Sequence, residues 1–74
     1  MFAERKTYTS TTLLNMDTGA KLELQADAGG YSVSYTVNGS VLVLEYQAPL
    51  SAAAAAYQRF RRELTAKSRV LVIP

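Results

Sequence analysis

Apolar and polar residues alternate along three consecutive stretches of the chain, and a short glycine-containing turn separates each stretch from the next. The stretches span residues 20–27, 31–37 and 40–47, and the turns are Gly29-Gly30 and Asn38-Gly39. A two-residue hairpin loop pairs the residues on either side of it, so each turn predicts a register. The two registers agree, because both place the same apolar side chains on one face. The pattern therefore predicts an antiparallel meander with one buried face.

These registers define the expected core. Asn38-Gly39 predicts the pairs Val37–Ser40, Tyr35–Leu42, Val33–Leu44 and Tyr31–Tyr46. Gly29-Gly30 predicts the pairs Ala28–Tyr31, Ala26–Val33, Leu24–Tyr35 and Leu22–Val37. Tyr31, Tyr35 and Tyr46 should then be buried. The opposite face should carry the polar positions of these strands together with Val41 and Val43.

A fourth strand is expected to precede the three, over roughly residues 6–15, where threonine is frequent and large apolar residues are few. Such a composition is typical of a sheet edge. Asp17-Thr18-Gly19 predicts a three-residue loop that pairs Met16 with Ala20, Leu14 with Leu22 and Thr12 with Leu24. A bulge at this loop is the alternative, and it would turn Leu13 inward instead of Leu14.

A helix and a last strand complete the pattern. Pro49 ends the meander, Ser51 is the expected N-cap ahead of five alanines, and the helix should end near Lys67 or Ser68. Its buried stripe is Leu50, Ala53, Tyr57, Phe60 and Leu64, and its outward positions are Gln58, Arg59, Arg62 and Ala66. Val70 to Ile73 are consecutive apolar residues that predict a short strand.

The expected fold is therefore one α+β domain over residues 1–74, in the order β-β-β-β-α-β, with the helix on one face of a four-stranded meander. The C-terminal strand should add to an edge of the sheet, with the threonine-rich strand as the expected acceptor. Both its direction and its edge stay open. Pairing with a second chain is the alternative, and it would produce a homodimer by exchange of Arg69–Pro74.

Composition narrows the chemistry. The 74 residues include no cysteine and no histidine, which excludes disulfides and the usual transition-metal ligand sets. No glycine-rich loop opens onto a helix, so no cofactor or phosphate cradle is expected. The first residues contain no apolar signal segment and no stretch could span a bilayer, which favours a soluble protein in the cytoplasm without a membrane partner.

Catalysis is not expected, because the acidic residues form no obvious pair and no histidine or cysteine is present to act as nucleophile or base. A basic cluster near the end of the helix is the best candidate for partner binding: Arg59, Arg61, Arg62, Lys67 and Arg69. These cations also complement the helix dipole and can pair with Glu63, and we favour that structural role over a site for phosphate or an acidic surface.

We interpret the chain as a small non-enzymatic module that binds a protein partner. In size and layout it resembles the short, cysteine-poor inhibitors of host defence complexes that phages and mobile elements encode, the anti-CRISPR proteins among them. The alternative is a nucleic-acid-binding module that uses the basic end of the helix. A homo-oligomeric structural or regulatory subunit is a third hypothesis.

Overall fold

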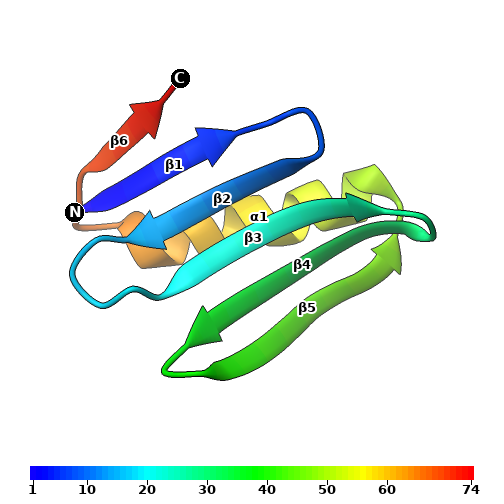
Figure 1. The fold of residues 1–74 in the computed structure, drawn as a ribbon, viewed down its shortest axis with the longest axis horizontal. Coiled ribbons are helices and arrows are strands. Elements are labelled where there is room, and N and C mark those ends of the chain that lie inside the picture. Colours follow the sequence, from blue (N-terminus) through cyan, green and yellow to red (C-terminus); the bar gives the residue numbers. More distant parts are fainter.

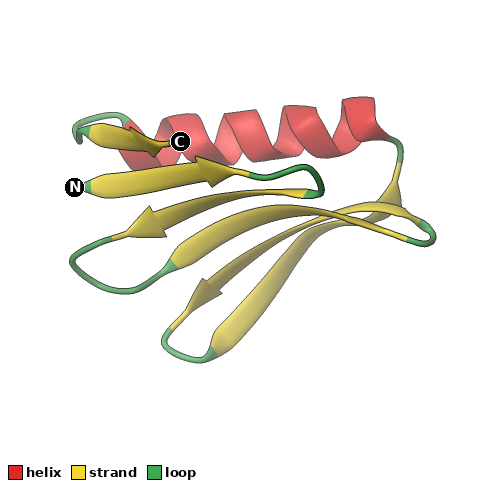
Figure 2. Ribbon diagram, turned by 45° about the horizontal axis from the view of Figure 1, so that its top comes forward, coloured by secondary structure: helices red, strands yellow, loops and turns green.

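Six strands form one mixed sheet, and a single helix lies across one of its faces (Figures 1 and 2). The structure is a computed structural model that describes all residues from Met1 to Pro74. In chain order the elements are β1 (Phe2–Lys6), β2 (Ser10–Asn15), β3 (Lys21–Asp27), β4 (Gly30–Val37), β5 (Ser40–Ala48), α1 (Leu50–Thr65) and β6 (Val70–Ile73). The strands lie in the order β5-β4-β3-β2-β1-β6, so β5 and β6 are the two edges.

The meander has five strands where the sequence predicted four. The single strand expected over residues 6–15 is wrong, since a turn at residues 7–9 divides this region into β2 and the end of β1. Thr7 and Ser10 close the turn with a backbone hydrogen bond of 2.7 Å, and their hydroxyl groups lie 2.9 Å apart. Except for Lys6, the residues of β1 were not assigned to any element by the sequence pattern.

The loop between β2 and β3 is longer than expected because the Asn15 side chain organises it. Asn15 Oδ1 accepts hydrogen bonds from the backbone N–H groups of Asp17 at 2.9 Å and Thr18 at 3.2 Å. Met16 thereby joins the loop, and Leu13 rather than Leu14 pairs with Leu22. The predicted three-residue loop is therefore wrong. Leu13 faces inward at 1% exposure, as the alternative expected, but the cause is the longer loop and not a bulge, since the β2–β3 register is continuous.

The turn between β3 and β4 also differs from the expected Gly29-Gly30 loop. Asp27 Oδ1 accepts a hydrogen bond of 2.8 Å from the Gly29 N–H, so the turn consists of Ala28 and Gly29 while Gly30 pairs with Asp27 in the ladder. Leu22 consequently lies opposite Tyr35, two positions from the predicted register. A shift of two residues leaves every side chain on its predicted face.

The Asn38-Gly39 hairpin forms as predicted. Both residues have positive φ, 51° and 79°, as a two-residue turn of this kind requires, and Tyr35 pairs with Leu42. Further along, β5 gains two extra residues relative to β4, so Val33 pairs with Glu45 and Tyr31 with Ala48. The predicted pairs with Leu44 and Tyr46 are therefore wrong, and Tyr46 is 70% exposed rather than buried.

The helix covers the predicted face with four of the five predicted stripe residues, Ala53, Tyr57, Phe60 and Leu64, whereas Leu50 is 50% exposed and was wrongly predicted as buried. It begins at Leu50 with Pro49 as N-cap, so Ser51 lies inside the helix and is not the cap. Tyr57 is 2% exposed, and the Phe60 ring packs against Tyr35 with a centroid distance of 5.0 Å. The fully buried core is Phe2, Leu13, Leu22, Val33, Ala53 and Tyr57, to which the helix contributes two residues. The only helix lacks the length and apolar character needed to cross a lipid bilayer.

The C-terminal strand joins the sheet within its own chain. β6 pairs in parallel with β1, with Phe2 beside Val70 and Arg5 beside Ile73, and the Phe2 N–H donates a 2.9 Å hydrogen bond to the carbonyl of Arg69. The sequence prediction placed the C-terminal strand at the correct edge of the sheet, on the side of the N-terminal strands. The acceptor is β1, however, and not the threonine-rich β2.

Candidate binding edge

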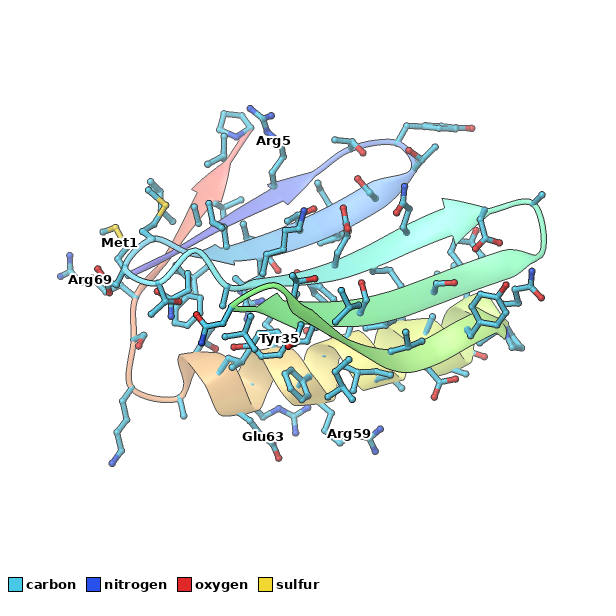
Figure 3. All side chains as sticks on the ribbon, turned by 60° about the horizontal axis from the view of Figure 1, so that its bottom comes forward. Met1, Arg5, Tyr35, Arg59, Glu63 and Arg69 are labelled. Carbon is cyan, nitrogen blue, oxygen red and sulfur yellow. The ribbon has the colours of Figure 1, made fainter.

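The five cations predicted as a cluster point in different directions. Arg59, Arg62, Lys67 and Arg69 are exposed, whereas Arg61 is partly buried. Figure 3 shows Arg59 projecting outward from the helix beside Glu63, while Arg69 lies near Met1 at one end of the molecule. The cations therefore do not form one continuous patch.

Arg61 faces the sheet, where it shares an acceptor with the helix residue Tyr57. The Tyr57 hydroxyl donates to Glu4 Oε2 at 2.7 Å, and Arg61 donates to Oε2 from Nε at 2.8 Å and to Oε1 from Nη2 at 3.1 Å. Glu4 belongs to β1 and points toward α1, with 14% of its side chain exposed. This Glu4 cluster joins the first strand to the helix through three hydrogen bonds.

The surroundings of the Glu4 cluster shift the pKa values of all three groups. Burial alone would raise the pKa of Glu4, but hydrogen bonds from Arg61 and Tyr57 and the charge of Arg61 outweigh it, so the pKa is lowered. Burial, together with the hydrogen bond to Glu4, raises the pKa of Tyr57. The hydrogen bond to Glu4 raises the pKa of Arg61. An ionised carboxylate that already accepts three hydrogen bonds is suited to holding elements together.

The β5 edge exposes four large apolar side chains, whereas the opposite edge, β6, exposes two, Leu71 and Val72. The four on β5, a strand of nine residues, are Val41 at 62% exposure, Leu42 at 53%, Val43 at 56% and Tyr46 at 70%. Edge strands are commonly protected by lysine, proline or a covering element, but β5 contains neither residue and no strand lies beyond it. Its outer row of backbone N–H and C=O groups is thus available to a further strand.

The course of β5 explains why Leu42 is exposed although its partner Tyr35 faces the helix. Leu44 is an extra residue between Val43 and Glu45, and a second extra residue lies between Glu45 and Ala48, where Gln47 has a φ of 49°. Bulges of this kind bend a strand and increase its twist. Figure 2 shows the β4–β5 hairpin diverging from the helix toward its turn, which leaves this end of the face uncovered.

The sheet face opposite the helix is polar in its centre, as predicted. The cross-strand pairs of β3 and β4 on this face are Lys21–Thr36, Glu23–Ser34 and Gln25–Ser32. None of these residues is aromatic, so the centre of the face offers no surface on which nucleic-acid bases could stack. Val41 and Val43 continue this face at the β5 edge.

No group of three or more metal-ligating side chains comes together in the structure. The exposed Leu42 and Tyr46 were missed as candidate binding residues because both were assigned to the core. The signal available in the sequence was the run from Val41 to Leu44, four consecutive apolar residues in place of the alternation expected for a strand with one buried face. Comparisons with protein families, with curated proteins and with solved structures find no match to this chain.

Proposed function

We propose that this chain is a non-enzymatic protein-binding module that pairs its β5 edge with an extended segment of a partner protein. The observation that carries the proposal is the exposed β5 edge, with its unpaired backbone groups and the apolar side chains of Val41, Leu42, Val43 and Tyr46. Strand addition of this kind gains affinity from main-chain hydrogen bonds and specificity from alternate side chains. Exposed apolar residues on a small domain commonly mark such an interface.

The shape of β5 favours a pliable partner segment over a second copy of the same chain. Two copies paired about a two-fold axis would each present a strand bent by two bulges, and only Ser40–Val43 pairs with β4 without a register shift. A flexible segment can follow this bend along the whole strand. Its matching residues should be apolar and β-branched, because β5 carries a single charge, Glu45.

For the biological role we favour an inhibitor that occupies a surface of a larger cytoplasmic complex, as anti-CRISPR proteins of phages and mobile elements do. The absence of cysteine and histidine supports this role, since occupying a partner's binding surface requires no catalytic group. The nucleic-acid-binding alternative has less support. Arg61 is held by Glu4, and the remaining cations are dispersed.

A pair of double variants tests the binding edge. Val41→Lys with Val43→Lys puts two charges on β5, whereas Thr12→Lys with Gln25→Lys puts two charges on the same face of the inner strands β2 and β3. The partner is first isolated with the tagged protein from the native host and identified. Its affinity for the purified wild-type chain and both variants is then measured by calorimetry.

We expect the β5 variant to bind at least about 30-fold more weakly, which is the effect of losing one interface hot spot of about 2 kcal/mol. The control variant should stay within about threefold of wild type. Equal affinity of the β5 variant and wild type would refute the proposal, as would recovery of nucleic acid alone. A wild-type dimer on sizing that the β5 variant converts to a monomer would assign the edge to a second copy instead.

A further inference from the structure

A groove lies on the helix face of the sheet, between the β1–β2 turn and the first turn of α1. It has a volume of about 400 Å³ and is open to solvent. Lys6, Thr11 and Leu24 form its floor as direct neighbours across β1, β2 and β3, while Leu50 of the helix borders it from above. The groove shares no residue with the β5 edge, because its lining comes from β1 to β4, the β1–β2 turn and the first residue of α1.

Thr11 is the only polar residue among the buried residues of the protein, at 8% exposure. Its hydroxyl takes part in none of the side-chain hydrogen bonds. Every polar side-chain atom that is fully sealed from solvent has a partner, so the unpartnered Thr11 hydroxyl keeps some contact with solvent, and Thr11 lines the groove. Buried hydroxyl groups are normally satisfied, and this one has no partner within the protein although its residue borders a ligand-sized space.

The charges around the groove favour an anion. Lys6 is the only ionised side chain that lines it, and no acidic residue does. Glu4 lies two residues away on the same face of β1, but Tyr57 and Arg61 already occupy both of its carboxylate oxygens. The lysine charge is therefore not neutralised by a direct ion pair.

The helix N-terminus adds to this positive character. The first helical hydrogen bond runs from the Ala53 N–H to the Pro49 carbonyl at 3.0 Å, which leaves the N–H groups of Leu50, Ser51 and Ala52 without helical acceptors. No side chain caps this end, and no acidic residue lies in the first turn. Uncapped N–H groups and the helix dipole both favour a negative charge nearby.

The remaining lining suits the body of an organic molecule. Leu24, Ala26, Tyr31 and Leu50 supply apolar and aromatic surface, and the volume lies within the range of small-molecule pockets. We infer that the groove binds a small organic anion whose phosphate or carboxylate group is held by Lys6 and the Thr11 hydroxyl. Its apolar or aromatic part would lie on Leu24 and Leu50.

Titrations followed by amide NMR test this inference with three aromatic probes of similar size. Phenyl phosphate and benzoate distinguish the two anionic groups, and benzyl alcohol is the uncharged control. Lys6→Met and Thr11→Val remove the two polar contacts with little change in side-chain volume. Lys21→Met and Thr12→Val make the same changes at positions outside the groove and serve as matched controls.

We expect saturable shifts of the groove amides with at least one anion, and an affinity for benzyl alcohol at least about tenfold lower. Lys6→Met and Thr11→Val should each weaken anion binding, Lys6→Met by about tenfold or more, as expected for losing a hydrogen bond to a charged group. The control variants should bind like wild type. The inference is overturned if neither anion produces saturable shifts, if the alcohol binds equally well, or if Lys6→Met binds the anions as wild type does.

Discussion

Replacing Glu4 with alanine removes the acceptor that Tyr57 and Arg61 share. Hydrogen bonds to a charged group contribute about 1.5–3 kcal/mol each, and Glu4 accepts three. The loss is smaller than their sum, because 27% of the Arg61 side chain is exposed and water can replace its contacts. The Tyr57 hydroxyl has no such substitute, since the residue is 2% exposed. We therefore expect Glu4→Ala to cost about 2–4 kcal/mol of unfolding free energy.

Urea denaturation monitored by circular dichroism measures this cost as a lower free energy of unfolding. For a domain of this size each kcal/mol corresponds to about 4–8 °C, so Tm in a thermal scan should fall by about 8–32 °C. Tyr57→Phe leaves the ion pair with Arg61 intact and should cost about 1–2 kcal/mol. The double variant should cost clearly less than the sum of the two single changes, because both remove the same hydrogen bond.

Glu63→Ala is the matched control, because Glu63 is exposed on the helix and forms no salt bridge. It should stay within about 0.5 kcal/mol of wild type. A similarly small effect of Glu4→Ala, or costs of Glu4→Ala and Tyr57→Phe that simply add, would show that the Glu4 cluster does not hold β1 against the helix.

Three further predictions follow from the structure. Because the pKa of Glu4 is lowered in the fold, its stabilising contribution should be complete above the ordinary glutamate pKa of about 4.3 and decline as the pH falls below it. In urea titrations at pH 3 to 6, Glu4→Gln should therefore show a smaller loss of unfolding free energy at low pH than wild type. Gly30→Ala should lower Tm more than Gly39→Ala. Both glycines have positive φ, but a Cβ at Gly30 would meet the Ala48 carbonyl oxygen at 2.9 Å, whereas a Cβ at Gly39 would meet no atom within 4 Å. Equal effects of the two changes on Tm would contradict this packing. Deleting Arg69–Pro74 should lower stability without changing the number of chains per particle on light scattering, because β6 pairs within its own chain; a change of oligomeric state would indicate exchange between chains.

The inward face could be predicted because its signal is local and redundant. Asn38-Gly39 fixes one register, and the alternation through Val33 and Leu22 repeats the same choice of face in neighbouring strands. The helix stripe follows from the spacing of Tyr57 and Phe60, and both contact the core. Such signals survive local errors, because a register shift of two residues leaves each side chain on its face.

The missed features depend on side chains that bond across the chain. Asn15 lengthens a loop by taking two backbone N–H groups, and this reverses the roles of Leu13 and Leu14. β1 was not predicted as a strand because Glu4 stands at one of its inward positions. A carboxylate at such a position is expected only when its hydrogen-bond donors are known, and these lie 53 and 57 residues further along the chain. No local pattern contains that information.

The candidate binding edge was missed for a topological reason. Whether a strand is an edge depends on where every other strand is placed, and β5 remains an edge because β6 joins the far side of the sheet. Composition instead drew attention to the cations near the helix end. Sequence position alone could not show that Arg61 faces Glu4 while Arg62, the next residue, faces solvent.

The parallel pairing of β1 and β6 also has a mechanical consequence. A tension applied between Met1 and Pro74 would pull β1 by its first residue and β6 by its last, in opposite directions along the strand axis. The hydrogen bonds between the two strands would then bear the load together in shear, rather than opening one after another as in a hairpin pulled from its open end. Handles attached at these two residues would make this four-residue ladder the first element to resist extension.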